Sequence, residues 1–170
     1  MKWQTVIIAD LGRVVTGTTP PTNQRQYYDG VYPFIKPSDL EFDTYRIRDT
    51  ATTLTDAAKS KFPNQFLPEN AVTFTCIGST VGKIGITTTD SFTNQQINSI
   101  VVNDEHDWRF VYYLLRYEIR RIRAMCSGVA SPIINKGAFE KIKVNVPSEL
   151  SVEQNIASIL SAYDDLIENN

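Results

Sequence analysis

The sequence predicts an α+β fold in which a mixed-strand domain with one supporting helix is followed by a projecting amphipathic helix. Three observations support this prediction. Short strand-like runs alternate with turn residues up to position 107. A long amphipathic pattern then begins at Trp108, and a second apolar stripe occupies the last segment. We therefore expect two units, a domain over residues 1–147 and a helix over residues 148–170.

The first part of the chain has the composition of a β-rich region, with many Thr, Gly, Pro and β-branched residues. In the run 71–77, Val72, Phe74 and Cys76 alternate with threonines, which is the period of a half-buried strand. A short helix is expected over residues 55–61. The predicted strands are residues 5–9, 31–36, 71–77, 83–88 and 97–102, and a last strand over residues 142–146 that Pro147 closes.

The supporting helix is predicted from about residue 108 to residue 125, where Ser127-Gly128 provides a plausible end. Its apolar residues recur at steps of three and four, which places them on one face. An adjacent arginine stripe could contact phosphates or an acidic partner, or could be an ordinary solvated face. The apolar face comprises Trp108, Val111, Tyr112, Leu115, Ile119 and Ile122, and the stripe comprises Arg109, Arg116, Arg120 and Arg123.

The last segment carries a heptad seam. Ser151 and Gln154 have the spacing of a capping box, which predicts the start of a helix there. A short helix with such a stripe needs a surface to pack on. That surface could be its own domain or a partner helix in a second copy or another subunit, and periodicity leaves both open. The seam consists of Val152, Ile156, Ile159, Tyr163 and Leu166, widened by Leu160 and Ile167.

Charge is distributed unevenly along the chain. The net charge is −2, but residues 1–147 hold 17 basic and 14 acidic residues, whereas residues 148–170 hold five acidic residues and no basic ones. The weakly basic body permits nucleic-acid binding. The apolar run near the N-terminus is too short to span a membrane, and the two cysteines lie far apart, so we expect a cytoplasmic protein without zinc or disulfides.

No catalytic constellation is recognisable. Gly78 and Gly82 precede Lys83 as in a phosphate-binding loop, but they are one residue too close and Ile84 replaces the Ser or Thr that would bind magnesium. We interpret this stretch as a hairpin with Ser79 and Lys83 exposed at its tip. Clustered carboxylates of the nuclease type and the methyltransferase motifs are missing, and the one histidine, in an acidic turn that we expect to be solvated, has no catalytic partner. We therefore predict a protein that is not an enzyme and holds no metal.

The remaining polar residues suit DNA reading. Asn and Gln can pair with adenine, and Arg and Lys with guanine or with phosphates. The candidates for reading bases gather in two segments, residues 23–27 after the loop 16–23 and residues 94–96. The candidate DNA-binding residues are Asn23, Gln24, Arg25, Tyr27, Lys36, Arg46, Arg48, Lys59, Ser79, Lys83, Asn94, Gln95 and Gln96.

The order of several short motifs resembles the specificity subunits of type I restriction-modification systems. The most specific block is Glu153-Gln154-Asn155-Ile156-Ala157 with the apolar residues that follow it, and the other motifs are weaker but span nearly the whole chain. They are Gly17-Thr18-Thr19-Pro20, Tyr28-Asp29-Gly30, residues 33–40, 76–78, 82–85, 94–100 and 139–144, Pro147, and residues 153–161 and 164–167.

This resemblance implies a DNA target-recognition domain over residues 1–147, followed by the start of a spacer helix over residues 148–170. Family members are non-catalytic and typically hold two such domains, whose paired helices set the gap in an interrupted DNA site. The implied partners are double-stranded DNA, modification subunits that methylate adenine and a restriction motor-nuclease subunit.

S-adenosylmethionine, Mg and ATP would belong to those partner subunits, so we expect no cofactor in this chain. Because only one recognition domain is present, the chain is either a natural half-subunit, which would pair with a second copy, or a fragment. The alternative function is a protein-interaction scaffold with negligible DNA affinity.

Overall fold

A computed structural model describes residues 2–125 and 132–168. The helices are α1 (Asp56–Lys61), α2 (Trp108–Met125), α3 (Lys136–Glu140) and α4 (Leu150–Glu168), with five short 3-10 helices, η1 (Ile8–Asp10), η2 (Arg25–Tyr27), η3 (Pro37–Asp39), η4 (Pro63–Gln65) and η5 (Gly78–Thr80). The strands are β1 (Trp3–Ile7), β2 (Gly12–Thr16), β3 (Tyr28–Ile35), β4 (Arg46–Ile47), β5 (Thr53–Leu54), β6 (Val72–Thr75), β7 (Ile84–Thr87), β8 (Phe92–Thr93), β9 (Ile97–Val102) and β10 (Lys143–Pro147).

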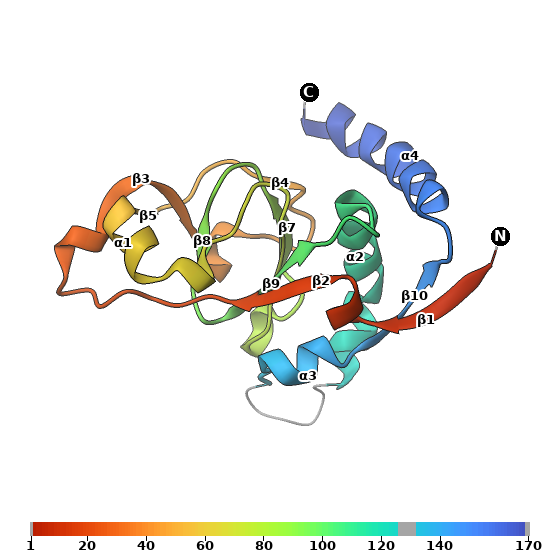
Figure 1. The fold of residues 1–170 in the computed structure, drawn as a ribbon, viewed down its shortest axis with the longest axis horizontal. Helices are drawn as coiled ribbons and strands as arrows, with labels where there is room; N and C mark the ends of the chain where they lie inside the picture. Colours follow the sequence, from red (N-terminus) through yellow and green to blue (C-terminus); the bar gives the residue numbers. More distant parts are fainter. Residues whose placement is uncertain (1, 126–131, 169–170) are drawn as a thin grey trace.

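Three sheets organise these strands (Figure 1). The largest has the order β2-β9-β6-β7-β4, in which the β4–β7 pair is parallel and the others are antiparallel. The second has the order β5-β3-β8, and the third pairs β1 with β10. Both larger sheets mix strand directions, which confirms the predicted α+β class with mixed strands.

Each of the six predicted runs overlaps an observed strand, whereas β2 and the two-residue strands β4, β5 and β8 were not predicted. The expectation that the run 71–77 is a half-buried strand was wrong. The strand β6 is buried on both faces, because the hydroxyls of its threonines find acceptors inside the protein. Thr73 donates to the carbonyl of Gly85 at 3.0 Å, and Thr75 donates to that of Lys83 at 3.2 Å. A threonine can be buried when its hydroxyl has a hydrogen-bond partner. The alternation of apolar residues with threonines therefore did not show that the threonine face is buried as well.

The main core lies between the large sheet and α2, and the predicted range and apolar face of this helix are confirmed. A second stripe of α2 is buried as well, formed by Phe110, Leu114 and Glu118. This stripe faces the groove where α4 and β10 approach α2. The helix therefore supports the sheet on one side and α4 on the other.

A distal lobe contains the β5-β3-β8 sheet and α1 (Figure 1). Its core is aromatic: Tyr27 packs edge-on against Phe62, with ring centroids 5.7 Å apart, and Phe66 packs in the same way against Phe92 at 5.3 Å. Aromatic pairs in this geometry are favourable beyond the area they bury. This separate core explains how the lobe keeps its shape away from α2.

The helix α4 starts two residues earlier than expected, because an N-cap at Ser151 would make Val152 its first residue. It begins at Leu150, so Ser151 lies inside its first turn and the predicted capping box is wrong. Glu153, Ala157 and Ser161 are its buried residues and face the domain. His106 also departs from its predicted solvated turn, because its side chain is 9% exposed and its Nδ1 lies 2.8 Å from a carboxylate oxygen of Glu153. No helix in the described parts of the chain is long and apolar enough to cross a membrane.

Candidate nucleic-acid interface

The two segments predicted to read bases lie side by side. In the loop that follows β2, the backbone N–H of Thr18 donates to the carbonyl of Thr93 at 3.0 Å, and the hydroxyl of Thr19 donates to Oε1 of Gln95 at 2.6 Å. A Cβ on Gly17 would lie 2.1 Å from the Thr93 carbonyl oxygen, so this approach requires glycine. Segments more than 70 residues apart in the chain thus form one surface.

The turn between β6 and β7 continues this surface. The N–H of Cys76 donates to the carbonyl of Gln96 at 2.8 Å, and that of Gly78 donates to the carbonyl of Pro132 at 2.8 Å. We call this surface the loop face and define it as residues 17–25, 94–96 and 78–80. Residues 17–19 make the contact with the second segment, and residues 20–25 continue the loop toward the distal lobe. Its exposed polar side chains include Thr19, Asn23, Arg25, Ser79 and Gln95.

Two of the predicted base-reading residues are internal. Asn94 is 9% exposed, and its Oδ1 accepts the N–H of Gln96 at 3.1 Å, so it shapes the turn that presents its neighbours. Tyr27 is also 9% exposed and packs in the distal core. In contrast, Gln24 and Gln96 are half-buried and remain at the surface.

Three predicted lysines are held by the protein itself. Lys83 is not exposed at the hairpin tip: its side chain is 16% exposed, and its Nζ donates to the carbonyl of Pro37 at 3.2 Å. Lys36 donates to the hydroxyl of Thr52 at 2.8 Å, and the Nζ of Lys59 lies 4.1 Å from the ring centroid of Phe66. The hairpin itself is confirmed, with an exposed Ser79.

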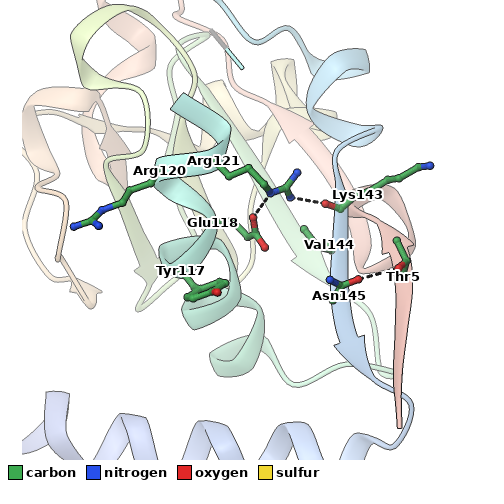
Figure 2. A pocket seen from close by; sticks show the side chains of 8 residues that line it. All are labelled: Thr5, Tyr117, Glu118, Arg120, Arg121, Lys143, Val144 and Asn145. Carbon is green, nitrogen blue, oxygen red and sulfur yellow. Dashed lines mark hydrogen bonds and ion pairs between the residues drawn. The ribbon is translucent and has the colours of Figure 1, made fainter. Parts of the chain in front are cut away.

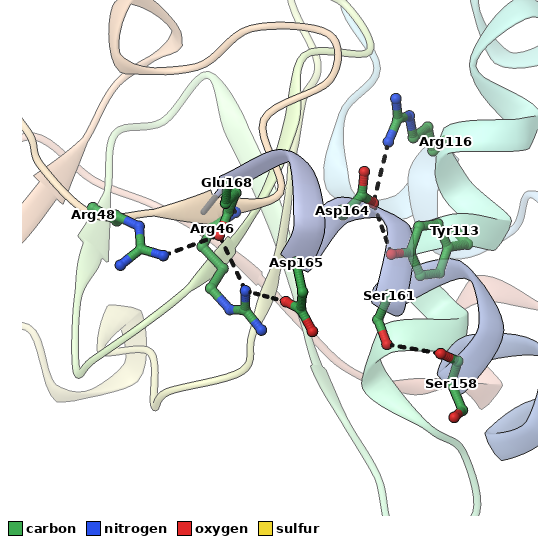
Figure 3. Close-up of polar contacts among 9 residues, drawn as sticks. All are labelled: Arg46, Arg48, Tyr113, Arg116, Ser158, Ser161, Asp164, Asp165 and Glu168. Carbon is green, nitrogen blue, oxygen red and sulfur yellow. Dashed lines mark hydrogen bonds and ion pairs between the residues drawn. The ribbon is translucent and has the colours of Figure 1, made fainter. Parts of the chain in front are cut away.

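Arg46 and Arg48 bind the end of α4 (Figure 3). The Nη1 of Arg46 lies 2.6 Å from Asp165 and 3.1 Å from Glu168, and the Nη2 of Arg48 lies 3.0 Å from Glu168. Burial opposes ionisation of Glu168, but hydrogen bonds from Arg48 and Arg46 outweigh it and lower its pKa. These arginines, predicted to hold phosphates, instead hold a helix, because the tertiary fold brings carboxylates to them.

One arginine of the predicted stripe on α2 joins the same attachment, whereas Arg109 pairs with Asp107 beside it. Arg116 lies 3.6 Å from Asp164, whose carboxylate also accepts the hydroxyl of Tyr113 at 2.7 Å (Figure 3). Burial raises the pKa of the Tyr113 hydroxyl, and its hydrogen bond to Asp164 raises it further. Tyr113 therefore stays protonated and acts as a donor. We call the set of Arg46, Arg48, Tyr113, Arg116, Asp164, Asp165 and Glu168 the α4 clamp.

A cleft of about 620 Å³ lies between α2 and β10 (Figure 2). Arg121 on its wall donates to the carboxylate of Glu118 and to the carbonyl of Lys143. Figure 2 shows Arg120 and Lys143 extending away from the cleft in opposite directions. The cleft therefore does not concentrate positive charge, although basic residues line it.

The whole chain, residues 1–170, matches the family model described as the type I restriction modification DNA specificity domain. The chain belongs to this family. Among curated relatives of this specificity domain is the type I restriction enzyme HindI specificity subunit of Haemophilus influenzae, which is 28% identical over 171 residues that include 99% of this chain and 37% of the relative. The MjaIX specificity subunit of Methanocaldococcus jannaschii is 27% identical over 170 residues, which include 98% of this chain and 39% of that subunit.

Solved structures share the fold of this specificity domain. The type I restriction-modification S subunit from M. genitalium has a TM-score of 0.71 at 20% identity, and the HsdS subunit from Thermoanaerobacter tengcongensis has a TM-score of 0.72 at 15% identity. The alignments cover 99% and 98% of this chain but 40% and 38% of those chains. The chain thus spans about two fifths of the length of its relatives.

Thr19 of the loop face was not among the predicted DNA-binding residues, because its side chain was not expected to pair with a base. Its hydroxyl fixes the amide of Gln95 and thereby positions a candidate reader. The motif Gly17-Thr18-Thr19-Pro20, which carried part of the family resemblance, was the signal in the sequence that marked it.

Proposed function

We propose that this chain is a sequence-specific DNA recognition subunit of a type I restriction-modification enzyme and is not itself a catalyst. The observation that carries the proposal is the convergence of two polar reading segments on one exposed loop face, in a chain of the DNA specificity family. Exposed amide and guanidinium groups can pair with base edges in the major groove. Arg25 and Gln95 are the residues that we assign to this role.

The proposed partners are double-stranded DNA, modification subunits and a restriction motor-nuclease subunit. The chain would place the modification subunits on the target, where they would methylate adenine with S-adenosylmethionine. Mg and ATP would likewise be held by partner subunits. Because its target is chromosomal and foreign DNA, we expect the protein to act in the cytoplasm.

The exposed seam of α4 supports a paired arrangement. Ile159, Tyr163 and Ile167 are 64%, 65% and 72% exposed, although apolar side chains of this size gain free energy when buried. We propose that residues 148–170 pair with the helix of a second copy, so that two domains, each formed by residues 1–147, read the two halves of an interrupted site.

The alternative is an interaction scaffold with negligible DNA affinity, which the net charge of −2 favours. The two functions differ in one measurement, the binding of a duplex by the isolated chain at low salt. A specificity subunit should bind, with an affinity that falls as salt rises.

The decisive experiment is co-expression of the chain with the genes that neighbour its own in the genome, a test for co-purification of an adenine methyltransferase subunit, and mapping of methylated adenines. We expect methylation at one interrupted motif. Gln95→Ala and Arg25→Ala should each relax one motif position by a factor equivalent to about 1–3 kcal/mol. Lys143→Ala, an exposed change on β10, is the matched control and should leave the motif intact. An unchanged motif in both loop-face variants would remove these residues from base reading.

A further inference from the structure

A cleft of about 350 Å³ beside β2 adjoins the loop face. Residues 13–16 of β2 form one wall, and Asn64, Gln65 and Lys136 complete the lining. Thr16 is followed directly by the loop that begins at Gly17, and Lys136 follows residues 132–134, which bond to the turn of the loop face. The cleft and the loop face are therefore parts of one continuous surface.

The lining offers hydrogen-bond donors and positive charge without a carboxylate. Arg13 is exposed and makes no ion pair with any described residue, and no described group bonds to the side-chain amides of Asn64 or Gln65. Lys136 is exposed and lies 3.6 Å from Glu140, which is outside the lining. Unlike the arginines of the α4 clamp, Arg13 is free for a ligand. Lys136 is engaged only by an exposed pair with Glu140 on its own short helix, and such a pair contributes little.

The edge of the large sheet adds backbone donors. Among the described strands, β2 pairs only with β9, and consecutive residues of β2 line the cleft, so the free edge of the strand faces it. A free edge presents N–H groups. Arg, Lys, Asn and backbone N–H groups are the donors that contact DNA phosphates, whereas bases are read in the grooves.

We propose that this cleft seats the phosphodiester backbone of the DNA whose bases the loop face reads, with Arg13 and Lys136 on phosphates. This inference rests on the proposed function. A concave wall of donors suits the convex sugar-phosphate strand and fixes its register, whereas the protruding side chains of Arg25 and Gln95 suit a groove. The cleft would therefore supply affinity and orientation without sequence preference.

The test is the salt dependence of duplex binding by the full chain, measured by fluorescence anisotropy between about 50 and 200 mM salt. The duplexes carry either the methylated motif or its scrambled sequence. Replacing both cleft cations, Arg13→Gln with Lys136→Gln, should reduce the slope of log K against log salt by about 0.9 for each phosphate that is no longer neutralised, equally on both duplexes. The methylation motif should not change.

The charge-matched control is Lys2→Gln with Lys143→Gln, two exposed lysines on and beside the β1–β10 pair, which should keep the wild-type slope. A second variant, Asn64→Ala with Gln65→Ala, should weaken binding to both duplexes without changing the slope. An unchanged slope in the cation variant, or a loss confined to the motif duplex, would overturn the cleft assignment alone. Absence of duplex binding by the wild-type chain would overturn the proposed function with it.

Discussion

At the residue scale, the carboxylate of Glu153 joins α4 to the turn before α2. It is 1% exposed, accepts the N–H of Asp107 at 2.9 Å and lies 2.8 Å from Nδ1 of His106. Asp107 in turn accepts the N–H groups of Arg109 and Phe110 at the start of α2. Burial opposes ionisation of Asp107, but these hydrogen bonds and the Arg109 side chain outweigh it and lower its pKa.

We expect Glu153→Ala to lower the free energy of unfolding by about 1–3 kcal/mol, because it leaves a buried N–H without an acceptor. Gln154→Ala is the matched control, since Gln154 is the exposed neighbour on the same helix, and it should change stability by less than about 0.5 kcal/mol. Denaturant unfolding measures both. Equal stability of the two variants would contradict a structural role for Glu153.

At the element scale, α4 has two faces with different functions. Glu153, Ala157 and Ser161 dock on the domain, and Ile156, which was predicted for the seam, is partly buried against the same core. The seam residues Ile159, Tyr163, Leu166 and Ile167 remain exposed. The periodicity left two packing surfaces open, the domain itself and a partner helix. The helix packs on its own domain and still exposes apolar residues that a partner helix could cover. The α4 clamp sets the direction in which that seam leaves the domain (Figure 3).

We expect Arg46→Gln to loosen the end of α4 without unfolding the protein, since partly exposed ion pairs contribute only about 0.2–1 kcal/mol. Hydrogen exchange should accelerate after Ser161 and stay slow near Glu153. Lys61→Gln, an exposed change on α1, is the control. Uniform exchange along α4 in the Arg46 variant would show that the clamp does not hold the helix end.

The same attachment should respond to acid. The pKa of Glu168 in the folded protein lies below its ordinary value of 4.5, so its stabilising effect is complete above that pH. The effect is lost as the pH falls through the lowered pKa. Exchange at the end of α4 should therefore increase below about pH 4.5 in the wild-type chain and depend less on pH in Glu168→Gln.

At the scale of the whole molecule, the exposed seam predicts self-association. The substitutions Ile159→Ser and Tyr163→Ser together remove two large apolar groups that are 64% and 65% exposed, so they should weaken pairing without loss of the fold. Sedimentation velocity should show a concentration-dependent dimer for the wild type and a monomer for this variant. Ala162→Ser, an exposed change between them, should still dimerise. A wild-type chain that stays monomeric at high concentration would contradict pairing through α4.

Local patterns in the sequence determined the class of fold and the range of α2. The step of three and four from Trp108 to Ile122 and the alternation in β6 depend on neighbouring residues, so they could be recognised without the fold. The expectation of a non-catalytic chain likewise followed from missing motifs, and the family resemblance followed from the order of the motifs that are present. Burial of the second face of β6 could not be predicted, because it depends on acceptors in other segments.

Tertiary structure alone decided which polar residues are available to a ligand. Arg25 and Arg46 look alike in the sequence, but Arg25 lies exposed on the loop face while Arg46 meets Asp165, which is 119 positions away. Tyr27 is buried because its ring packs against Phe62, and Asn94 is buried because its side chain accepts a hydrogen bond within the turn. The sequence by itself determined the periodic elements and the family. The pairing of distant segments determined the loop face, the cleft and the α4 clamp, because a side chain becomes free or engaged only when its long-range neighbours are in place.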